Sequence, residues 1–359
     1  MYLTTMTVQS SKHPYNVLFI DDYVSVLKKH ILPDDVVIVD ANILEIYRNQ
    51  LTPILKDIFH IVIEPSEKQK SYQGVEPFIY QLIEAGFRKN NRLIAIGGGI
   101  VQDITAFTAS IIFRGVEWFF YPTTLLAQCD SCIGSKTSIN FGDYKNQLGG
   151  FYPPKEIIID VNFLQTLSSL DFRSGMGEML HYYLVSGEVD FNRITREYDI
   201  AFNDPKVLRE LVYHSLEIKR DYVEKDEFDQ GPRNVFNYGH SFGHAIETLT
   251  DYAIPHGIAV SIGMDLANHL SVQQGYIKHE DYKRIRLLLQ KNWDDVCLPS
   301  IVMDDFIALL KKDKKTIGAE IHVILTKGLG QMFKTPLPVT PKILGWIANY
   351  FESFNNPSS

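Results

Sequence analysis

A short apolar run that ends in three glycines constrains the fold of this chain more than any other stretch. Residues 93–96, Leu-Ile-Ala-Ile, predict a buried strand, and Gly97-Gly98-Gly99 follow directly before a predicted helix over 100–113. Strand, glycine turn and helix in this order are the plan of a dinucleotide-binding α/β domain. Gln102 occupies the last glycine position of the full G-x-G-x-x-G spacing, so a purely structural turn is the alternative.

The alternation of strands and helices continues on both sides of this turn. Apolar runs predict further strands, and periodic segments predict helices over 43–59 and 75–89. The further strands are expected over 36–40, 61–63, 118–121 and 157–160. Residues 1–167 therefore predict an α/β N-terminal dinucleotide-binding domain. Within it, the polar, glycine-containing segment 127–155 lacks a clear period and predicts a long functional loop.

The remainder of the chain has a helical pattern. The next strand signal after residue 168 occurs at 321–325. Residues 168–359 therefore predict an all-α, mainly helical C-terminal domain that would bind metal and substrate.

Composition and charge narrow the classes of protein to consider. The net charge of −8 argues against a general nucleic-acid-binding surface. No apolar run reaches membrane-spanning length, and the polar first 15 residues predict no signal peptide. Cys129 and Cys132 would suit half a zinc site or a redox pair, but without a second such pair small buried side chains are favoured. We expect a cytoplasmic protein that binds neither membrane nor nucleic acid.

Two histidines four residues apart, His240 and His244, predict one shared helix face. His256 follows after Pro255, and Glu178 lies upstream. Histidine nitrogens and a carboxylate oxygen are typical ligands of a catalytic divalent metal. A metal site is therefore one interpretation, and a helix with two solvated histidines is the other.

Charged side chains suited to anions are concentrated in the expected loop and near the histidines. The loop segment holds Asp130, Lys136, Lys145 and Asn146. Lysine supplies a point charge for phosphate or carboxylate, and asparagine adds directed hydrogen bonds. Arg233 precedes the histidine motif, which favours a negatively charged substrate. A solvated loop with ordinary surface cations is the alternative.

The order and spacing of these motifs resemble the 3-dehydroquinate synthase family. The resemblance extends from about residue 40 to about residue 329, and the wider group of sugar phosphate cyclases shares the fold and cofactor but differs in substrate. The matching segments are 97–103, Arg114-Gly115-Val116, 122–128, Lys136-Thr137-x-x-Asn140, Lys145-Asn146, Gly177-Glu178, Asp226-Glu227, Arg233, 237–247, His256-Gly257 and Asp313-Lys314-Lys315.

The resemblance implies a role for each matching side chain. A divalent metal, zinc or cobalt, would be held by Glu178, His240 and His256. NAD would be surrounded by Asp40, Asn42, Glu67, Lys70, Gly98, Gly99, Ile100, Asp103, Thr123, Thr124, Phe163 and Thr166. Substrate binding and catalysis would involve Arg114, Asp130, Lys136, Lys145, Asn146, His181, Lys219, Arg233, Asn237, His244, Lys314 and Lys315. His244 would then contact phosphate or transfer a proton, which replaces the interpretation of His240 and His244 as two metal ligands.

The implied activity is that of a carbon–oxygen lyase acting on a phosphate. It would convert 3-deoxy-D-arabino-heptulosonate 7-phosphate to 3-dehydroquinate and phosphate, by transient oxidation with NAD, phosphate elimination, reduction and aldol closure. Lys219 and Arg233 would recognise the carboxylate of this shikimate-pathway substrate. The resemblance also implies a homodimer, with Arg114 reaching phosphate across the interface.

One position departs from the family pattern close to the implied metal. His181 stands where the family carries lysine in Glu-x-x-Lys, and histidine is shorter and mostly neutral at pH 7. This change keeps two alternatives open, a cyclase of the 2-deoxy-scyllo-inosose or 2-epi-5-epi-valiolone synthase type and a metal-dependent polyol dehydrogenase.

Overall fold

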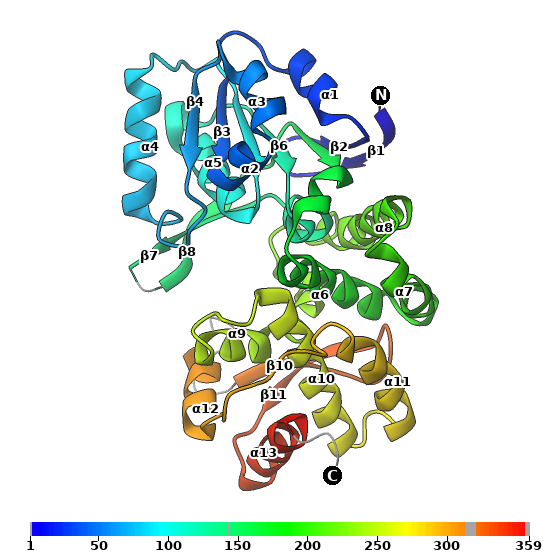
Figure 1. The fold of residues 1–359 in the computed structure, drawn as a ribbon. Helices are drawn as coiled ribbons and strands as arrows, with labels where there is room; N and C mark the ends of the chain where they lie inside the picture. Colours follow the sequence, from blue (N-terminus) through cyan, green and yellow to red (C-terminus); the bar gives the residue numbers. More distant parts are fainter. Residues whose placement is uncertain (1, 143, 313–320, 356–359) are drawn as a thin grey trace. The chain divides into compact units, whose positions relative to one another are not determined.

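The computed structural model describes residues 2–142, 144–312 and 321–355. Their contacts divide the chain into two compact units (Figure 1). The first unit contains the chain up to Ser168 together with Lys219–Phe228, and the second contains Ser169–Ile218 and everything from Asp229 onward. The chain thus returns to its first unit for a short segment. In the described residues, no helix combines the length and apolar character that crossing a membrane requires.

A seven-stranded sheet forms the centre of the first unit, in the order β1-β2-β9-β6-β5-β3-β4. Neighbouring strands are parallel except β1, which pairs antiparallel with β2. The bounds are β1 Tyr2–Val8, β2 Tyr15–Ile20, β3 Val36–Asp40, β4 His60–Ile63, β5 Leu93–Gly97, β6 Trp118–Pro122 and β9 Glu156–Asp160. Every residue of β3, β5 and β6 is buried, which explains their unbroken apolar sequences.

Helices cover both faces of this sheet. Side chains such as Val39, Ile96 and Tyr121 form one core with residues of α1, α2 and α3. α5 contacts β3, β5 and β6 without contributing to that core, so it lies on the opposite face. The helices of the first unit are α1 Tyr23–His30, α2 Ala41–Ile46, α3 Arg48–Leu55, α4 Tyr72–Glu84, α5 Gly99–Ile111, the 3-10 turns η1 Ile112–Arg114 and η3 Val161–Thr166, and the π-helical turn η2 Ala127–Ser131.

The segment 127–155 is more regular than its sequence predicts. It contains η2 and an antiparallel hairpin of β7 (Lys136–Phe141) and β8 (Tyr144–Phe151). Most of β8 is exposed, so no buried face imposes the alternation by which a strand is recognised. β1 and β2 were also absent from the prediction. β1 lies at the edge of the sheet and alternates short polar residues with buried Met6 and Val8.

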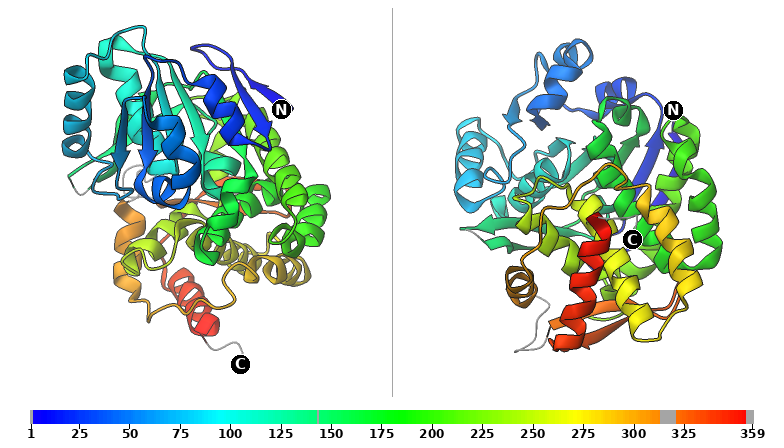
Figure 2. Two further views of the ribbon diagram at one scale, coloured as in Figure 1. Left: turned by 45° about the horizontal axis from the view of Figure 1, so that its top comes forward. Right: turned by 60° about the horizontal axis from the view of Figure 1, so that its bottom comes forward.

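The second unit is built around one buried helix, α10 (His256–Gln273), which is buried along nearly its whole length. It contacts α6, α9, α11, α13 and β10, and Figure 2 shows α13 in red beside it. The other elements are α6 Ser169–Ser186, α7 Glu188–Ala201, α8 Pro205–Val223, η4 Pro232–Asn237, α9 His240–Leu249, α11 His279–Gln290, α12 Met303–Lys312, β10 Ile321–Thr326, β11 Met332–Leu337 and α13 Pro341–Asn355. The predicted strand at 321–325 is β10, and it pairs antiparallel with β11.

Candidate metal centre and cofactor site

Three side chains from three helices of the second unit meet at one carboxylate oxygen. Glu178 lies in α6, while His240 and His256 are the first residues of α9 and α10. Oε1 of Glu178 is 3.5 Å from Nε2 of His240 and 3.1 Å from Nε2 of His256. This oxygen is buried and accepts no hydrogen bond of good geometry within the described residues. An orphaned carboxylate oxygen facing two imidazole nitrogens fits a divalent cation.

Glu178, His240 and His256 form a triangle of candidate ligands, and the close approach of α6 and α10 makes this triangle possible. A Cβ atom on Gly177 would lie 1.9 Å from the carbonyl oxygen of Gly257, and a Cβ on Gly257 would lie 1.8 Å from that of Ser174. Only hydrogen atoms fit between the two backbones, so Glu178 next to Gly177 is brought to His256 next to Gly257. His240 is positioned differently. Gly239, which precedes it, has a φ of +81° that glycine adopts readily, and this turn lets α9 begin at His240.

The second nitrogen of each histidine is also engaged. Nδ1 of His256 donates to Oε2 of Glu247 at 2.9 Å, and Nδ1 of His240 donates to the carbonyl oxygen of Tyr238 at 3.3 Å. These bonds select the tautomer that leaves Nε2 free to bind a metal. Glu247 was part of the sequence motif but had no predicted role. The available signal was its place one helical turn beyond His244.

The electrostatics of the triangle favour positive charge beside Glu178. Burial acts to raise the pKa of Glu178, but His240 and His256 outweigh it and hold that pKa well below its usual range. Burial acts to lower the pKa of His256, but Glu247 and Glu178 hold it well above the usual value. A divalent metal would take the place of the histidine protons in balancing these carboxylates.

Two further histidines lie against the triangle. The exposed His244 stacks on His256 with ring centroids 5.5 Å apart, and it groups with Glu247 and His256 rather than with His240 as a possible ligand. His181 has no exposed surface. Its ring contacts Tyr182, Phe236 and Tyr238, and meets His240 edge-on at 5.2 Å. The structure therefore encloses His181 behind a candidate ligand.

Two other predicted residues of the second unit lie in η4, directly before α9. Arg233 is buried with 5% of its surface exposed, and Asn237 donates from Nδ2 to the carbonyl oxygen of Asn234 at 3.0 Å. Lys314 and Lys315 lie outside the described residues.

The predicted nucleotide turn lies at the carboxyl edge of the sheet in the first unit. Gly98 precedes α5, where a Cβ would lie 2.9 Å from Cγ2 of Thr124, whereas a Cβ on Gly99 would meet open space. The hydroxyl of Thr123 is buried and has no partner among the described residues. Uncovered amides at the start of a helix, a glycine surface and an orphaned hydroxyl fit a dinucleotide phosphate. Ile100 lies in the first turn of the same helix.

Asp40 ends β3, the strand beside β5, so it lies next to the glycine turn. Oδ1 of Asp40 accepts from the amides of Asn42 and Ile43, which caps α2. Burial outweighs these bonds and raises the pKa of Asp40. Its second oxygen would suit a ribose hydroxyl.

Several predicted cofactor residues also hold the hairpin. Nζ of Lys70 is 2.7 Å from Oδ2 of Asp103, whose other oxygen accepts from the amide of Ser138 at 3.2 Å. Burial raises the pKa of Asp103 despite Lys70. Glu67 accepts from Nδ2 of Asn140 at 2.8 Å.

Phe163 and Thr166, both predicted to contact the cofactor, lie in η3. The ring of Phe163 is fully buried in the core with Tyr23 and Tyr47, and its carbonyl oxygen accepts from the hydroxyl of Tyr47 at 3.3 Å, so Phe163 presents no exposed surface to a ligand. Oγ1 of Thr166 lies 3.1 Å from the hydroxyl oxygen of Tyr47.

The predicted anion-binding residues of the first unit fall into two groups. Lys219 is 5% exposed and donates to the carbonyl and Oδ1 of Asp130 at 2.6 and 2.7 Å. Lys136, Lys145 and Asn146 are exposed on the hairpin, where Asn146 has a φ of +53°. Arg114 is exposed at the end of η1, in a turn with positive φ at Phe113, Arg114 and Gly115.

Comparisons with known proteins agree with the resemblance seen in the sequence. Residues 60–174 match the family model for the 3-dehydroquinate synthase N-terminal region, and residues 175–316 match the C-terminal model. The 3-dehydroquinate synthase of Alkaliphilus metalliredigens is 34% identical over 312 residues, which cover 85% of this chain and 88% of that protein. That of Thermodesulfovibrio yellowstonii is 35% identical over 342 residues, covering 91% and 94%.

Solved structures share the fold at lower identity. A 2-deoxy-scyllo-inosose synthase complexed with carbaglucose-6-phosphate, NAD+ and Co2+ has a TM-score of 0.83 at 22% identity, covering 96% of this chain and all of that one. The 2-epi-5-epi-valiolone synthase ValA of Streptomyces hygroscopicus, with NAD+ and Zn2+ bound, has a TM-score of 0.83 at 23% identity, covering 96% and 98%. The predicted fold class is therefore confirmed.

Proposed function

Since this chain belongs to the 3-dehydroquinate synthase family, we propose that it converts 3-deoxy-D-arabino-heptulosonate 7-phosphate to 3-dehydroquinate and phosphate. NAD and one divalent metal, zinc or cobalt, serve as cofactors. The observation that carries the proposal is the buried Oε1 of Glu178, which faces Nε2 of both His240 and His256.

The two cofactors supply the chemistry that amino-acid side chains lack. Bound NAD would supply reversible acceptance of a hydride from a substrate hydroxyl. A metal held by Glu178, His240 and His256 supplies Lewis-acid polarisation of substrate oxygens. The overall conversion is redox-neutral, so no net NADH is expected.

The side chains of the protein position these groups. In the first unit, the amides after Gly98 and the hydroxyl of Thr123 hold the phosphates of NAD, and Asp40 holds a ribose hydroxyl. In the second unit, Glu247 and the carbonyl of Tyr238 keep the Nε2 atoms of the two histidine ligands directed at the metal. The exposed His244 binds phosphate or transfers a proton.

Two buried cationic side chains support a substrate that carries a carboxylate. Arg233 is buried, and Lys219 is held rigidly by its two bonds to Asp130. We assign both to recognition of the substrate carboxylate, for which a neutral sugar phosphate has no need. Lys136, Lys145 and Asn146 of the hairpin bind the remaining polar groups of the substrate.

The proposed assembly is a cytoplasmic homodimer. The turn at Phe113 and Arg114 supports dimerisation, because it places 41% of Phe113 on the surface beside Ile111, which is 47% exposed. Sedimentation of the wild type and of Arg114→Ala tests this assembly. A monomeric wild type at assay concentrations would refute it.

Release of inorganic phosphate tests the activity. Protein loaded with NAD and zinc or cobalt is given the seven-carbon keto acid phosphate, glucose 6-phosphate and sedoheptulose 7-phosphate in parallel, with Glu178→Gln as the control. We expect phosphate from the keto acid alone, without net NADH, and none from the variant. Phosphate from a neutral sugar alone would instead support another sugar phosphate cyclase, the alternative favoured by His181 in place of the family's lysine. Net NADH would indicate a polyol dehydrogenase.

A further inference from the structure

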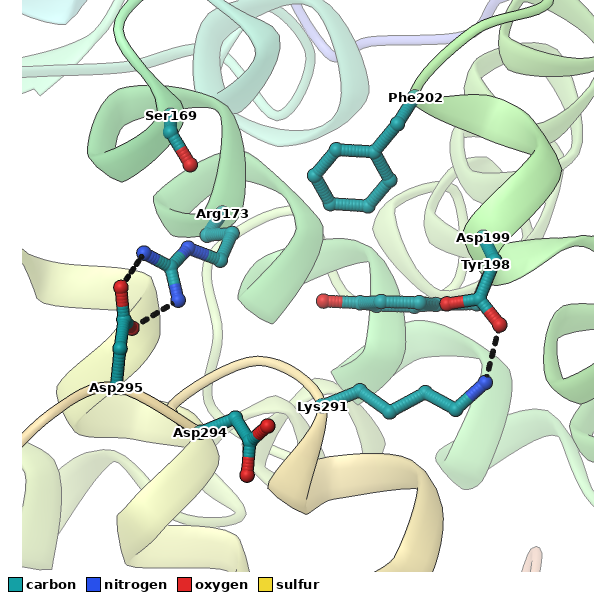
Figure 3. A pocket seen from close by; sticks show the side chains of 8 residues that line it. All are labelled: Ser169, Arg173, Tyr198, Asp199, Phe202, Lys291, Asp294 and Asp295. Carbon is teal, nitrogen blue, oxygen red and sulfur yellow. Dashed lines mark hydrogen bonds and ion pairs between the residues drawn. The ribbon is translucent and has the colours of Figure 1, made fainter.

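A surface hollow of about 510 Å³ lies in the second unit and shares no residue with the metal triangle. The first turns of α6, the last turn of α7 and the segment after α11 form its walls (Figure 3). Its lining consists of Ser169, Arg173, Tyr198, Asp199, Phe202, Lys291, Asp294 and Asp295. This volume lies within the range of small-molecule sites.

Among the charged side chains that line the hollow, one carboxylate is not paired with a cation. Arg173 donates from both terminal nitrogens to Asp295, with one contact at 2.8 Å, and Lys291 is paired with Asp199. These four charges cancel. Asp294 has no hydrogen bond or ion pair among the described residues, although Arg173 attracts it electrostatically. With two cations and three carboxylates, the lining carries a formal charge of −1. An anion would have to displace Asp295 or Asp199 from its cation, whereas a cation finds Asp294 available.

An apolar wall accompanies the carboxylate. Phe202 is 38% exposed, and its ring packs on Phe172 and Tyr198 at centroid distances of 4.6 and 5.4 Å. It caps the carboxyl end of α7, where the helix dipole favours positive charge. Tyr198 is fixed by donating to Asn292 at 2.8 Å. Figure 3 shows Phe202 above the hollow and Asp294 below it.

We propose that this hollow binds a primary ammonium or guanidinium group carried on a small apolar body. The cation pairs with Asp294, and the body contacts the ring of Phe202. The net charge of −8 on the whole chain attracts such a ligand. The same chemistry is offered by a free amine and by a lysine side chain of a peptide.

Calorimetric titration of the full chain tests the site without any enzymatic activity, so its outcome is independent of the proposed reaction. The probes are phenethylamine for a free amine, Nα-acetyl-lysine amide for a peptide side chain, and phenylacetate as the anion of similar shape. We expect at least one amine to bind and phenylacetate not to bind. Whichever amine binds more tightly identifies the source.

Two variants locate the binding. Asp294→Asn and Phe202→Ala are each expected to weaken the binding of the amine about two- to fivefold, because each removes one of its two contacts at an exposed position. Asp304→Asn alters an exposed carboxylate in the first turn of α12 and is the matched control for charge. Thermal unfolding verifies that the variants are folded. No binding of either amine, equal binding by phenylacetate, or undiminished binding to a folded Asp294→Asn would overturn the proposal.

Discussion

The hydrogen bond between Glu247 and His256 provides a direct test of the metal centre. Glu247→Gln keeps the shape of the side chain and a carbonyl oxygen that can accept from Nδ1 of His256, now 2.9 Å away. Only the negative charge is lost. The side chain of Glu247 is 12% exposed and that of His256 is 32% exposed, so solvent screens the pair only in part.

The expected loss follows from the strengths of the two kinds of hydrogen bond. A bond to a charged group contributes about 1.5–3 kcal/mol and a neutral one about 0.5–1.5 kcal/mol, so the difference is about 1–1.5 kcal/mol. This corresponds to roughly a tenfold weaker binding of the metal. The value lies at the lower end of the roughly 10–100-fold range for partners that orient metal ligands.

The assay is competition for zinc with a chromophoric chelator at fixed pH and ionic strength. Glu188→Gln is the matched control, because it removes an exposed carboxylate of the same unit that pairs with Arg284 and belongs to none of the three helices of the metal centre. Zinc binding by Glu247→Gln that is as tight as in the wild type would refute the reasoning. An equal loss in Glu188→Gln would also refute it, because the effect would then come from net charge.

Three more predictions follow from packing and burial. Gly177→Ala places a Cβ 1.9 Å from the carbonyl oxygen of Gly257, so we expect the free energy of unfolding in denaturant to fall by about 3 kcal/mol or more. An unchanged denaturant midpoint would contradict this close approach of α6 and α10. Burial lowers the pKa of His30 from 6.5 to about 4, so between these values the unfolded chain binds a proton that the folded chain does not. The free energy of unfolding should therefore fall as pH decreases from 6.5 to 4, by about 1–2 kcal/mol after solvent screening. His30→Gln should flatten this dependence on pH, and an equally steep dependence in the variant excludes His30 as its origin. His181→Lys buries an ammonium among aromatic rings and should lower the thermal midpoint, and an unchanged midpoint would contradict the enclosure of this position.

Most of the strands that are buried on both faces were predicted from the sequence, although the almost wholly buried β2 was missed and the half-exposed β4 was found. β3, β5, β6 and β9 are continuous apolar runs because helices cover each side of the sheet, and such runs are recognisable without knowledge of their neighbours. β1 and β8 have exposed faces and polar or glycine-rich sequences, so their strand character depends on pairing partners. Local periodicity does not contain that information.

The segment Lys219–Phe228 illustrates a second limit. Its first residues continue the helix α8, so the sequence assigns them to the helical domain. Contacts far along the chain attach the segment to the first unit instead. Lys219 bonds Asp130, and Glu227 accepts from the hydroxyl of Ser10 at 2.5 Å and the amide of Ser11 at 2.8 Å. Polar contacts between residues 89 or more positions apart cannot be inferred from spacing.

The metal centre shows the same limit at the level of single residues. The spacing of His240 and His244 places both on α9, with ring centroids 5.8 Å apart. Oε1 of Glu178 nevertheless faces His240 and His256, which come from different helices. Which histidine faces the carboxylate depends on the glycine contact between α6 and α10, which is a tertiary feature. The resemblance to a family supplied this grouping, and helical spacing alone did not.

Charge balance explains why the triangle needs a second carboxylate. His240 and His256 are the first residues of their helices, where the positive end of the helix dipole opposes a bound cation. Two neutral histidines and Glu178 would leave a divalent ion with a net charge of +1 at these two helix ends. Glu247, bonded to Nδ1 of His256, brings the sum of +2, −1 and −1 to zero. Glu247 therefore does more than orient an imidazole, since it removes the charge that the helix ends disfavour. The same balance predicts that a variant lacking Glu247 recovers part of its metal affinity at high ionic strength, where the helix dipoles are screened.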